Sequence, residues 1–538
     1  MSETHQILRS TRVITFITLL SRVSGYIRDL VVALLLGTSL AADAFVIAFR
    51  IPNFLRRLMA EGAMTAAFIP VFTSHRAERT EAESWDFARR MFWSLTIVLA
   101  AVTVLGILFA PQLVRLFTLA SPAPEQWDLA VLLSRITFPY CLLVSLIALA
   151  SAALNTVGSF GLPASVPIYL NLAIIGAGAI AWRWGATEAA IALAVGVLVG
   201  GVFQLVIQLP PLLRRGMPLG FKLGFEHEGV RRVSRLMLPA VAGIGIYQVN
   251  VLVSTAIASQ EAGWISALYY ANRLTELALG VYAISVATVV LPLMSRQAVA
   301  GRLDQLHQTM TFSLCNVAFV MIPATVGLMV LSAPIVRVLF EHRAFSSTST
   351  DLTASALFFY AFGLPAFASV RLLVQGFYAT EDTKTPVRVS VVAIVANLIL
   401  CFALVGPLRQ GGLALATSLA SYLHSLVLYV VYRRRLGAPD EARLTVSLLR
   451  TSAASAGMGF LCWFLGRELG LMQVKSFPVL LALFVLVIAA GVVSYLALAW
   501  LLRAPELGEV YTLVTGRKHR ASELPGVQGV VPGAPPND

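Results

Sequence analysis

Apolar runs of about twenty residues recur along the whole chain, each bounded by charge, proline or glycine. A helix needs about 20 residues to cross the ~30 Å hydrocarbon layer of a bilayer. Fourteen runs reach that length, at residues 13–37, 40–74, 91–111, 129–154, 163–182, 189–210, 236–258, 264–294, 311–335, 352–379, 389–407, 412–432, 446–466 and 477–502. Because 58% of the residues are hydrophobic and 12% are charged, the pattern predicts an all-α integral membrane protein with 14 transmembrane helices.

Two of these runs, 40–74 and 264–294, are longer than a straight span requires and contain proline or glycine. We expect each of them to bend, tilt or project beyond the bilayer.

Lysine and arginine are divided unevenly between the two sets of connections. With the N-terminus inside, the cytoplasmic connections hold 24 of these residues and the opposite set holds 7, with the largest excess in 211–235 and at 433–435. Positive residues stay on the cytoplasmic side, so both termini are predicted to be cytoplasmic. The same bias explains most of the net charge of +13 without a nucleic-acid partner. Residues 503–538 are rich in glycine and proline and are predicted to form a disordered cytoplasmic tail.

Similar sequence patterns recur in the two halves of the chain, at an offset of about 222 to 226 residues. The matched positions are Pro70 with Pro292, Pro139 with Pro365, and Asn171 with Asn397. An even number of helices per copy gives both copies the same direction in the membrane. We therefore predict two six-helix lobes in a parallel pseudo-twofold repeat, residues 1–222 and 223–440, around a central cationic cavity. Two further helices lie in 441–502.

Positive charge exceeds negative charge within the predicted spans. Nine arginines lie there, namely Arg22, Arg28, Arg50, Arg56, Arg57, Arg135, Arg273, Arg371 and Arg450, against four acids, Asp29, Asp43, Glu61 and Glu276. A charge at the bilayer centre costs about 2.5–3.5 kcal/mol, so such residues normally face a bundle interior or a wet cavity. The planar guanidinium binds phosphate bidentately, and the excess of arginine therefore favours an anionic substrate.

A purely structural role is the alternative for part of this charge. Arg57 with Glu61, and Arg273 with Glu276, have the helical spacing of ion pairs that could only clamp helices together. Such pairs do not account for the remaining arginines. A cation exporter would need the opposite balance, with buried carboxylates in excess.

Motifs for other chemistry are missing from the sequence. It contains no GxxxxGK[ST], GxSxG or HExxH, and the four cysteines lie singly in apolar runs, which predicts buried thiols outside any disulfide. The sequence therefore predicts a transporter that uses no cofactor or metal, rather than an enzyme.

Long motifs occur in the charged spans and in their connections. They are SRVSGYIRDLVVALLLG, ADAFVIAFRIPNFLRRLMAEGAMTAAFIPVF, YYANRLTEL, ITFPY and TKTPV. Together they resemble the MurJ (MviN) family of lipid II flippases, within the multidrug/oligosaccharidyl-lipid/polysaccharide exporter superfamily, across essentially all fourteen spans. The resemblance implies an inner-membrane transporter that moves undecaprenyl-pyrophosphate-linked disaccharide-pentapeptide (lipid II) from the cytoplasmic to the periplasmic leaflet for peptidoglycan assembly.

The resemblance also implies residue roles. We expect substrate binding by Arg22, Arg28, Asn53, Arg56 and Arg273, and gating or ion pairing by Asp29, Asp43, Arg57, Glu61 and Glu276. Asn272 departs from the family, in which many relatives carry an acid before the arginine, so a coupling or gating role of that acid does not transfer to this chain. The helices in 441–502 are expected to form a groove for the lipid tail. Lipid II and the phospholipid bilayer are the implied partners, and cell-wall synthesis proteins are candidate partners.

Three alternatives remain open at this stage. A flippase for another polyprenyl-pyrophosphate glycan would need the same arginines. An ion-coupled drug exporter of the same superfamily is disfavoured by the positive charge. A non-transporting membrane scaffold would tolerate arginine substitution.

Overall fold

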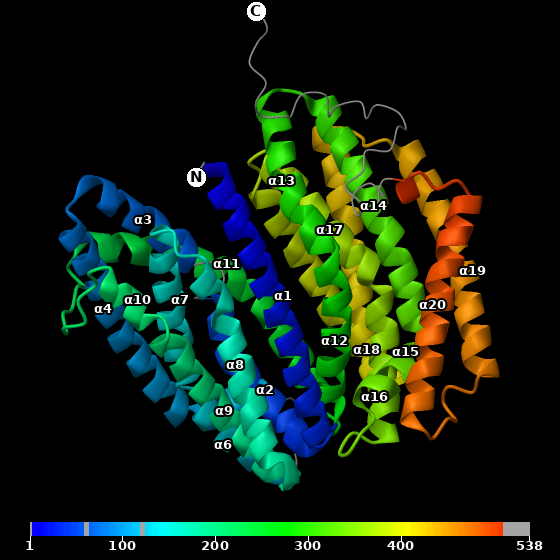
Figure 1. Cartoon of the computed structure of the whole chain (residues 1–538), viewed down its shortest axis with the longest axis horizontal. Helices are drawn as coiled ribbons and strands as arrows, with labels where there is room; N and C mark the ends of the chain where they lie inside the picture. The colour runs from blue at the N-terminus through cyan, green and yellow to red at the C-terminus, as the bar shows by residue number, and fades with distance from the viewer. Residues whose placement is uncertain (1–2, 59–63, 119–123, 509–538) are drawn as a thin grey trace, which may run out of the picture. The chain divides into compact units, whose positions relative to one another are not determined.

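The computed structural model describes residues 3–58, 64–118 and 124–508, and the regular secondary structure in these ranges is helical, with no β-strand (Figure 1). The chain divides into two compact units. Unit 1 comprises Met1–Ala271, Val336–Ala356 and Leu398–Leu413, and unit 2 comprises Asn272–Ile335, Leu357–Asn397 and Ala414–Asp538.

The helices follow one another with short connections. Up to residue 214 they are α1 (Glu3–Leu36), α2 (Leu40–Leu58), α3 (Met64–Glu78), α4 (Glu81–Leu108), α5 (Ala110–Leu116), α6 (Pro124–Thr137), α7 (Tyr140–Thr156), α8 (Gly161–Ile180), η2 (Ala181–Arg183), α9 (Ala186–Val206) and α10 (Leu209–Arg214). From residue 228 they are α11 (Glu228–Ala258), α12 (Trp264–Val281), α13 (Ala283–Val299), α14 (Leu303–Val330), α15 (Ser332–Phe340), α16 (Ser347–Phe362), α17 (Leu364–Ala379), α18 (Lys384–Leu436), α19 (Glu441–Glu468) and α20 (Phe477–Leu501).

Helix breaks recur between the two halves of the chain. Helix α4 ends at Leu108 and is followed by one residue and the short α5, just as α14 ends at Val330 and is followed by one residue and the short α15. Pro139 immediately precedes α7, and α17 has a proline in its first turn. The breaks therefore follow the offset found in the sequence. The two lobes, with boundaries at 222 and 440, remain predictions.

Most predicted spans coincide with long apolar helices. Within the three described ranges, eight helices are long and apolar enough to cross a membrane, and a ninth is obtained if α16 and α17, bent by 42°, form one span. The run 264–294 is interrupted at Tyr282, between α12 and α13, so it does not continue as one straight helix. The run 40–74 contains α2 and α3, and residues 59–63 between them lie outside the described ranges. Helix α18 contains a break at Arg409 (φ 52°, ψ −137°), which separates the predicted spans 389–407 and 412–432. The total of fourteen membrane crossings remains a prediction.

Each unit has its own apolar core. In unit 1, the buried rings of Phe68, Phe72, Trp85 and Phe87 contact one another, with centroids 5.1 to 6.3 Å apart. In unit 2, a second cluster of buried side chains from α13, α14, α17 and α18 surrounds Tyr432. All four cysteines are buried and none forms a disulfide, as the sequence predicts.

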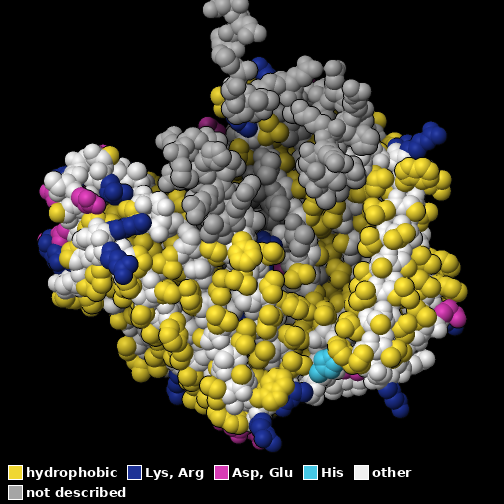
Figure 2. Space-filling model, viewed as in Figure 1, with side chains coloured by type: hydrophobic (Ala, Val, Ile, Leu, Met, Phe, Trp, Pro, Cys, Tyr) yellow, Lys and Arg dark blue, Asp and Glu magenta, His cyan; other side chains and the backbone are white. Residues whose placement is uncertain are grey.

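In unit 2, α19 packs against α14, and α20 packs against α19. Helix α20 carries no charged residue, and its buried side chains form one stripe at Leu480, Phe484, Val487, Gly491, Tyr495 and Ala499. The hydroxyl of Tyr495 donates to the carbonyl of Phe319 at 2.6 Å. Its other faces expose large apolar side chains such as Val493 and Trp500, and hydrophobic side chains cover this helix in Figure 2. Such a surface is suited to lipid rather than to water.

Helix α11 begins with a histidine cap. Nδ1 of His227 accepts a hydrogen bond from the amide of Gly229 at 3.2 Å, and its ring stacks on Phe87, with centroids 5.4 Å apart. Burial, followed by the positive charge of Arg90 and the neighbouring His75, lowers the pKa of His227 below its ordinary value of 6.5.

We expect this cap to weaken in acid. Because the folded-state pKa is depressed, the unfolded chain binds the proton first, so the stability that neutral His227 contributes is fully present above about pH 6.5 and is lost as the pH falls. Thermal unfolding of the detergent-purified protein between about pH 8 and about pH 5.5 should show this loss. His227→Asn keeps a capping acceptor that does not titrate, so its melting temperature should depend less on pH. An unchanged pH dependence in this variant would contradict the assignment.

Candidate functional site

The best-defined polar site lies in unit 1, where α1 packs along α8. Arg28 and Asp29 of α1 form an ion pair there. Nε and Nη2 of Arg28 both donate to Oδ1 of Asp29, at 3.0 and 2.7 Å, and the two side chains are 13% and 7% exposed. Asp29 thus forms a largely buried ion pair with Arg28; whether Asp29 has a role in gating stays a prediction.

Two further helices hold this pair in place. Nη1 of Arg28 donates to Oδ1 of Asn171 on α8 at 3.0 Å, and the hydroxyl of Tyr269 on α12 donates to Oδ1 of Asp29 at 3.0 Å. Nδ2 of Asn171 donates in turn to Oγ of Ser24 at 3.0 Å. Each group in this network is thus oriented by a neighbour, which fixes the guanidinium before any ligand arrives.

Gly25 of α1 lies beside Asn171 of α8. A Cβ built on Gly25 would lie 3.4 Å from Nδ2 of Asn171, an ordinary van der Waals distance, so the two helices are in contact at this position.

Asp43, for which the sequence predicts gating or ion pairing, makes contacts in the structure that the sequence did not indicate. Its carboxylate is fully buried and accepts hydrogen bonds from the amides of Gly263 (2.7 Å) and Ser266 (2.8 Å) and from the hydroxyl of Ser266 (2.7 Å). These amides lie at the beginning of α12, where helical N–H groups have no carbonyl partner within the helix. Asp43 therefore caps α12 from α2, and its negative charge lies at the positive end of the helix dipole.

Arg50 also connects α2 to a distant part of unit 1. Its Nη1 donates to the hydroxyl of Thr255 on α11. The sequence places Arg50 within a span without assigning it a role, and this contact shows that at least one of the span arginines ties helices together.

The polar residues on α12 that belong to unit 2 form a second small cluster. Nη1 of Arg273 donates to Oε2 of Glu276 at 2.7 Å, and Nδ2 of Asn272 donates to Oε1 of the same carboxylate at 3.1 Å. Arg273 and Glu276 thus form an ion pair within α12. An acid in place of Asn272 could not donate this hydrogen bond and would repel Glu276, so the amide suits its position in this chain.

The remaining predicted residues are only partly described. Arg22 is exposed on α1, and Asn53 is half-buried just after Pro52 in α2. The side chains of Arg56 and Arg57, and the whole of Glu61, lie outside the part of the chain that the structure describes. A common binding cavity for these residues is therefore still a prediction.

Sequence reasoning missed three contributors to the site in unit 1, namely Asn171, Tyr269 and Ser266. Asn171 gave a signal as a polar residue in an apolar run that is matched with Asn397 in the second half, and Tyr269 gave one as the first residue of the motif YYANRLTEL. Across the described ranges, no group of three or more His, Cys, Asp or Glu side chains is placed to hold a metal ion.

Comparison with known proteins agrees with the geometry. The chain matches the family model described as lipid II flippase MurJ over residues 32–483. A probable lipid II flippase MurJ from Vibrio cholerae is 38% identical over 435 residues, covering 79% of this chain and 82% of the relative. Lipid II flippase MurJ from Burkholderia cenocepacia is 32% identical over 467 residues, covering 85% of this chain and 90% of the relative.

Solved structures show the same fold. The lipid II flippase MurJ in an inward closed conformation has a TM-score of 0.76 and 26% identity, covering 94% of this chain and 99% of that chain. An inward-facing multidrug resistance MATE family transporter has a TM-score of 0.64 over 80% of this chain and 98% of its own, but at 14% identity this likeness shows the fold alone. Since the family model spans most of the sequence and both relatives are covered over more than two thirds of their length, the chain belongs to the lipid II flippase MurJ family.

Proposed function

We propose that this chain is a flippase that moves lipid II from the cytoplasmic to the periplasmic leaflet of the inner membrane. The observation that carries the proposal is the match to lipid II flippases across residues 32–483, with relatives of that name at 32–38% identity. The long apolar helices agree with a multi-pass membrane transporter. As a transporter, the protein changes the position of its substrate and leaves the covalent bonds unchanged.

In this proposal the pyrophosphate of lipid II is bound by Arg22, Arg28, Arg56 and Arg273, with Asn53 beside them. The geometry around Arg28 supports this role, because Asp29 and Asn171 hold its guanidinium in one orientation. A preoriented planar group loses little entropy when it binds an oxyanion. Arg56, Arg57 and Glu61 enter the proposal from their sequence motif alone.

The proposed transport cycle is alternating access. Lipid II enters a cationic cavity between the lobes 1–222 and 223–440 from the cytoplasmic leaflet, and rocking of the lobes then exposes it to the periplasm. The helices of 441–502 guide the polyprenyl tail, and the tail segment 503–538 and both termini lie in the cytoplasm. Cell-wall synthesis proteins that use lipid II are the candidate partners.

Leaflet-resolved tracking of lipid II in cells depleted of this protein tests the function. We expect lipid II to accumulate on the cytoplasmic side and to disappear from the outer side. Its continued appearance on the outer side, in cells that hold no other flippase, would overturn the proposal.

The pair on α12 gives a second test, which separates a binding role from a clamping role. The Arg273 and Glu276 side chains are 27% and 41% exposed, and an ion pair this exposed contributes at most about 1 kcal/mol to stability. We expect Glu276→Gln to melt at nearly the wild-type temperature and to sustain growth of a flippase-depleted strain. Arg273→Ala should be equally stable but should not sustain growth. Equal growth of the two variants would mean that Arg273 serves only as the partner of Glu276.

A further inference from the structure

The segment between α10 and α11 has two different faces. It has the sequence MPLGFKLGF at residues 217–225, and we refer to these nine residues as the 217–225 strap. Every second side chain from Leu219 is apolar and exposed, with 38% exposure for Leu219, 63% for Phe221, 40% for Leu223 and 47% for Phe225. We refer to these four exposed side chains as the apolar face of the strap; the ring of Phe221 also contacts the ring of Trp93 on α4, with centroids 5.2 Å apart.

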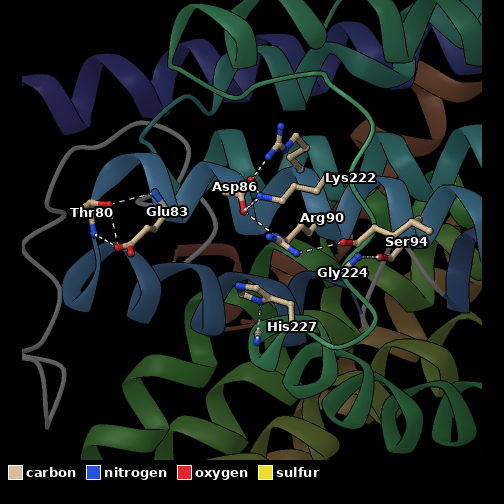
Figure 3. Close-up of polar contacts among 11 residues, drawn as sticks. Thr80, Glu83, Asp86, Arg90, Ser94, Lys222, Gly224 and His227 are labelled. Carbon is tan, nitrogen blue, oxygen red and sulfur yellow. Dashed lines mark hydrogen bonds and ion pairs between the residues drawn. The ribbon is translucent and has the colours of Figure 1, made fainter.

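The intervening residues of the strap face α4 (Figure 3). Nζ of Lys222 lies 3.1 and 3.0 Å from the two carboxylate oxygens of Asp86, and the amide of Gly224 donates to Oγ of Ser94 at 2.9 Å. A Cβ on Gly224 would lie 2.5 Å from Cβ of Arg90, so only glycine allows the strap to lie this close to α4.

Side chains of α4 also hold the backbone of the strap. Nε1 of Trp93 donates to the carbonyl of Leu219 at 3.1 Å, and Nη1 of Arg90 donates to the carbonyl of Leu223 at 3.3 Å. Arg90 is itself paired with Asp86 at 2.7 Å. The strap is thus fixed along its length, and its apolar face is exposed by a specific arrangement rather than by loose packing.

The position of the strap along α4 indicates what covers this face. The strap contacts residues 86–94 of α4, and the predicted membrane span begins at residue 91. The apolar face therefore lies at the depth where hydrocarbon gives way to headgroups.

The charged residues near the strap are mostly positive, which suits contact with an anionic surface. Residues 211–235 hold six lysines and arginines and two acids. Five of these basic residues are exposed in the structure, namely Arg214, Arg215, Arg231, Arg232 and Arg235. Apolar side chains flanked by arginine are typical of segments that lie in the interface of membranes with anionic lipid.

We propose that the 217–225 strap docks on the headgroup region of the bilayer that holds the protein. Phe221 and Phe225 insert among the lipids, and the surrounding arginines face anionic headgroups. Through its contacts with α4, the docked strap holds this end of unit 1 at a fixed depth. The inference does not depend on which substrate is transported.

Site-specific fluorescence on the full-length protein tests the proposal. Phe221→Cys and Phe225→Cys are labelled with an environment-sensitive dye and placed in vesicles of phosphatidylcholine, with or without phosphatidylglycerol. The native cysteines are buried and will not compete for the dye. Ala82→Cys, an exposed position near the start of α4 and well before residue 91, is the matched control.

We expect the labels at 221 and 225 to emit at shorter wavelength than the label at 82. Nitroxide-labelled headgroups should quench them more strongly than they quench the control, and phosphatidylglycerol should increase that quenching. The variant Arg231→Gln/Arg232→Gln should lose the added effect of phosphatidylglycerol while keeping the quenching in phosphatidylcholine.

Two results would overturn the proposal. The first is equal access of iodide to positions 221 and 82 in both kinds of vesicle. The second is protection of position 221 in inside-out vesicles of native membrane, where the cytoplasmic face is open to iodide, together with full iodide access in lipid vesicles, since this would assign the face to a protein partner. Elution of each labelled variant as a single species in detergent ensures that unfolding does not explain the exposure.

Discussion

Replacing Arg28 by alanine is expected to abolish growth of a strain that depends on this protein. The substitution removes hydrogen bonds that include two to Asp29 and one to Asn171, and it removes the guanidinium proposed to bind pyrophosphate. It also leaves the carboxylate of Asp29, which is only 5% exposed, without the guanidinium that neutralises it. Removing one partner of a buried ion pair typically destabilises a protein by about 3–5 kcal/mol, so loss of growth alone would not identify the cause.

A double variant separates these two effects. In Arg28→Ala/Asp29→Asn, no buried charge lacks its partner, and the melting temperature of the purified protein should recover most of the loss. Growth should remain abolished, because no guanidinium has been restored. Arg28→Lys should also fail to sustain growth, since an ammonium cannot bind a diphosphate in the bidentate way that the planar fork allows.

Arg450→Ala is the matched control. Arg450 is half-buried in α19, and its Nη1 donates to the carbonyl of Arg503 at 2.9 Å, as expected of an arginine near the end of a span. This variant should sustain normal growth at a normal level in the membrane. Normal growth of Arg28→Ala/Asp29→Asn would show that Arg28 only neutralises Asp29.

The positions of the helices could be predicted because apolar run length and helix geometry are local properties. Each of the fourteen predicted ranges falls on a helix or helix pair wherever the structure describes it. The breaks at Phe138–Pro139 and at Gly363 were not predicted, because the runs 129–154 and 352–379 are short enough to be single spans. Whether a proline bends or divides such a run depends on packing against other helices.

The candidate site was predictable to the extent that it depends on one helix. Arg273 and Glu276 are three residues apart on α12, so their pairing follows from the helical repeat. The network around Arg28 does not follow in the same way. The sequence gives Asp29 a gating or ion-pairing role without naming its partner, whereas the structure pairs Asp29 with its neighbour Arg28 and adds Asn171 and Tyr269 from distant helices.

The contacts of Asp43 also could not be predicted from the local sequence. A buried acid in a predicted span suggests an ion pair or a gate, since these are the roles that offset the cost of burial. The N-terminus of a helix offsets it equally well, through amide donors and the helix dipole. The helix that Asp43 caps begins more than two hundred residues later in the chain, and no local pattern connects the two.

Asp43→Ala is therefore expected to destabilise unit 1 strongly. The substitution leaves the amides of Gly263 and Ser266 and the hydroxyl of Ser266 without their acceptor in a buried environment. Each such group costs about 1–3 kcal/mol when it is left unsatisfied, so the total loss should be several kcal/mol. It should appear as a large drop in the midpoint of thermal unfolding in detergent. The backbone around Gly263 cannot easily move to replace the lost contacts, because it is already closely packed. Gly263 has a φ of +83°, and a Cβ built on it would lie 2.7 Å from the carbonyl oxygen of Thr38.

Two milder variants show whether the cap is responsible. Ser266→Ala removes one of the three hydrogen bonds and should cost about 1 kcal/mol. Asp43→Asn keeps one acceptor oxygen but turns an amide group toward one of the donors, so its stability should fall between those of Ser266→Ala and Asp43→Ala. If Asp43→Ala unfolded at the same temperature as Ser266→Ala, the two backbone hydrogen bonds would contribute nothing. We expect the stability to rise in the order Asp43→Ala, Asp43→Asn, wild type only if the carboxylate holds the beginning of α12, and with it the segment that carries Arg273, in position.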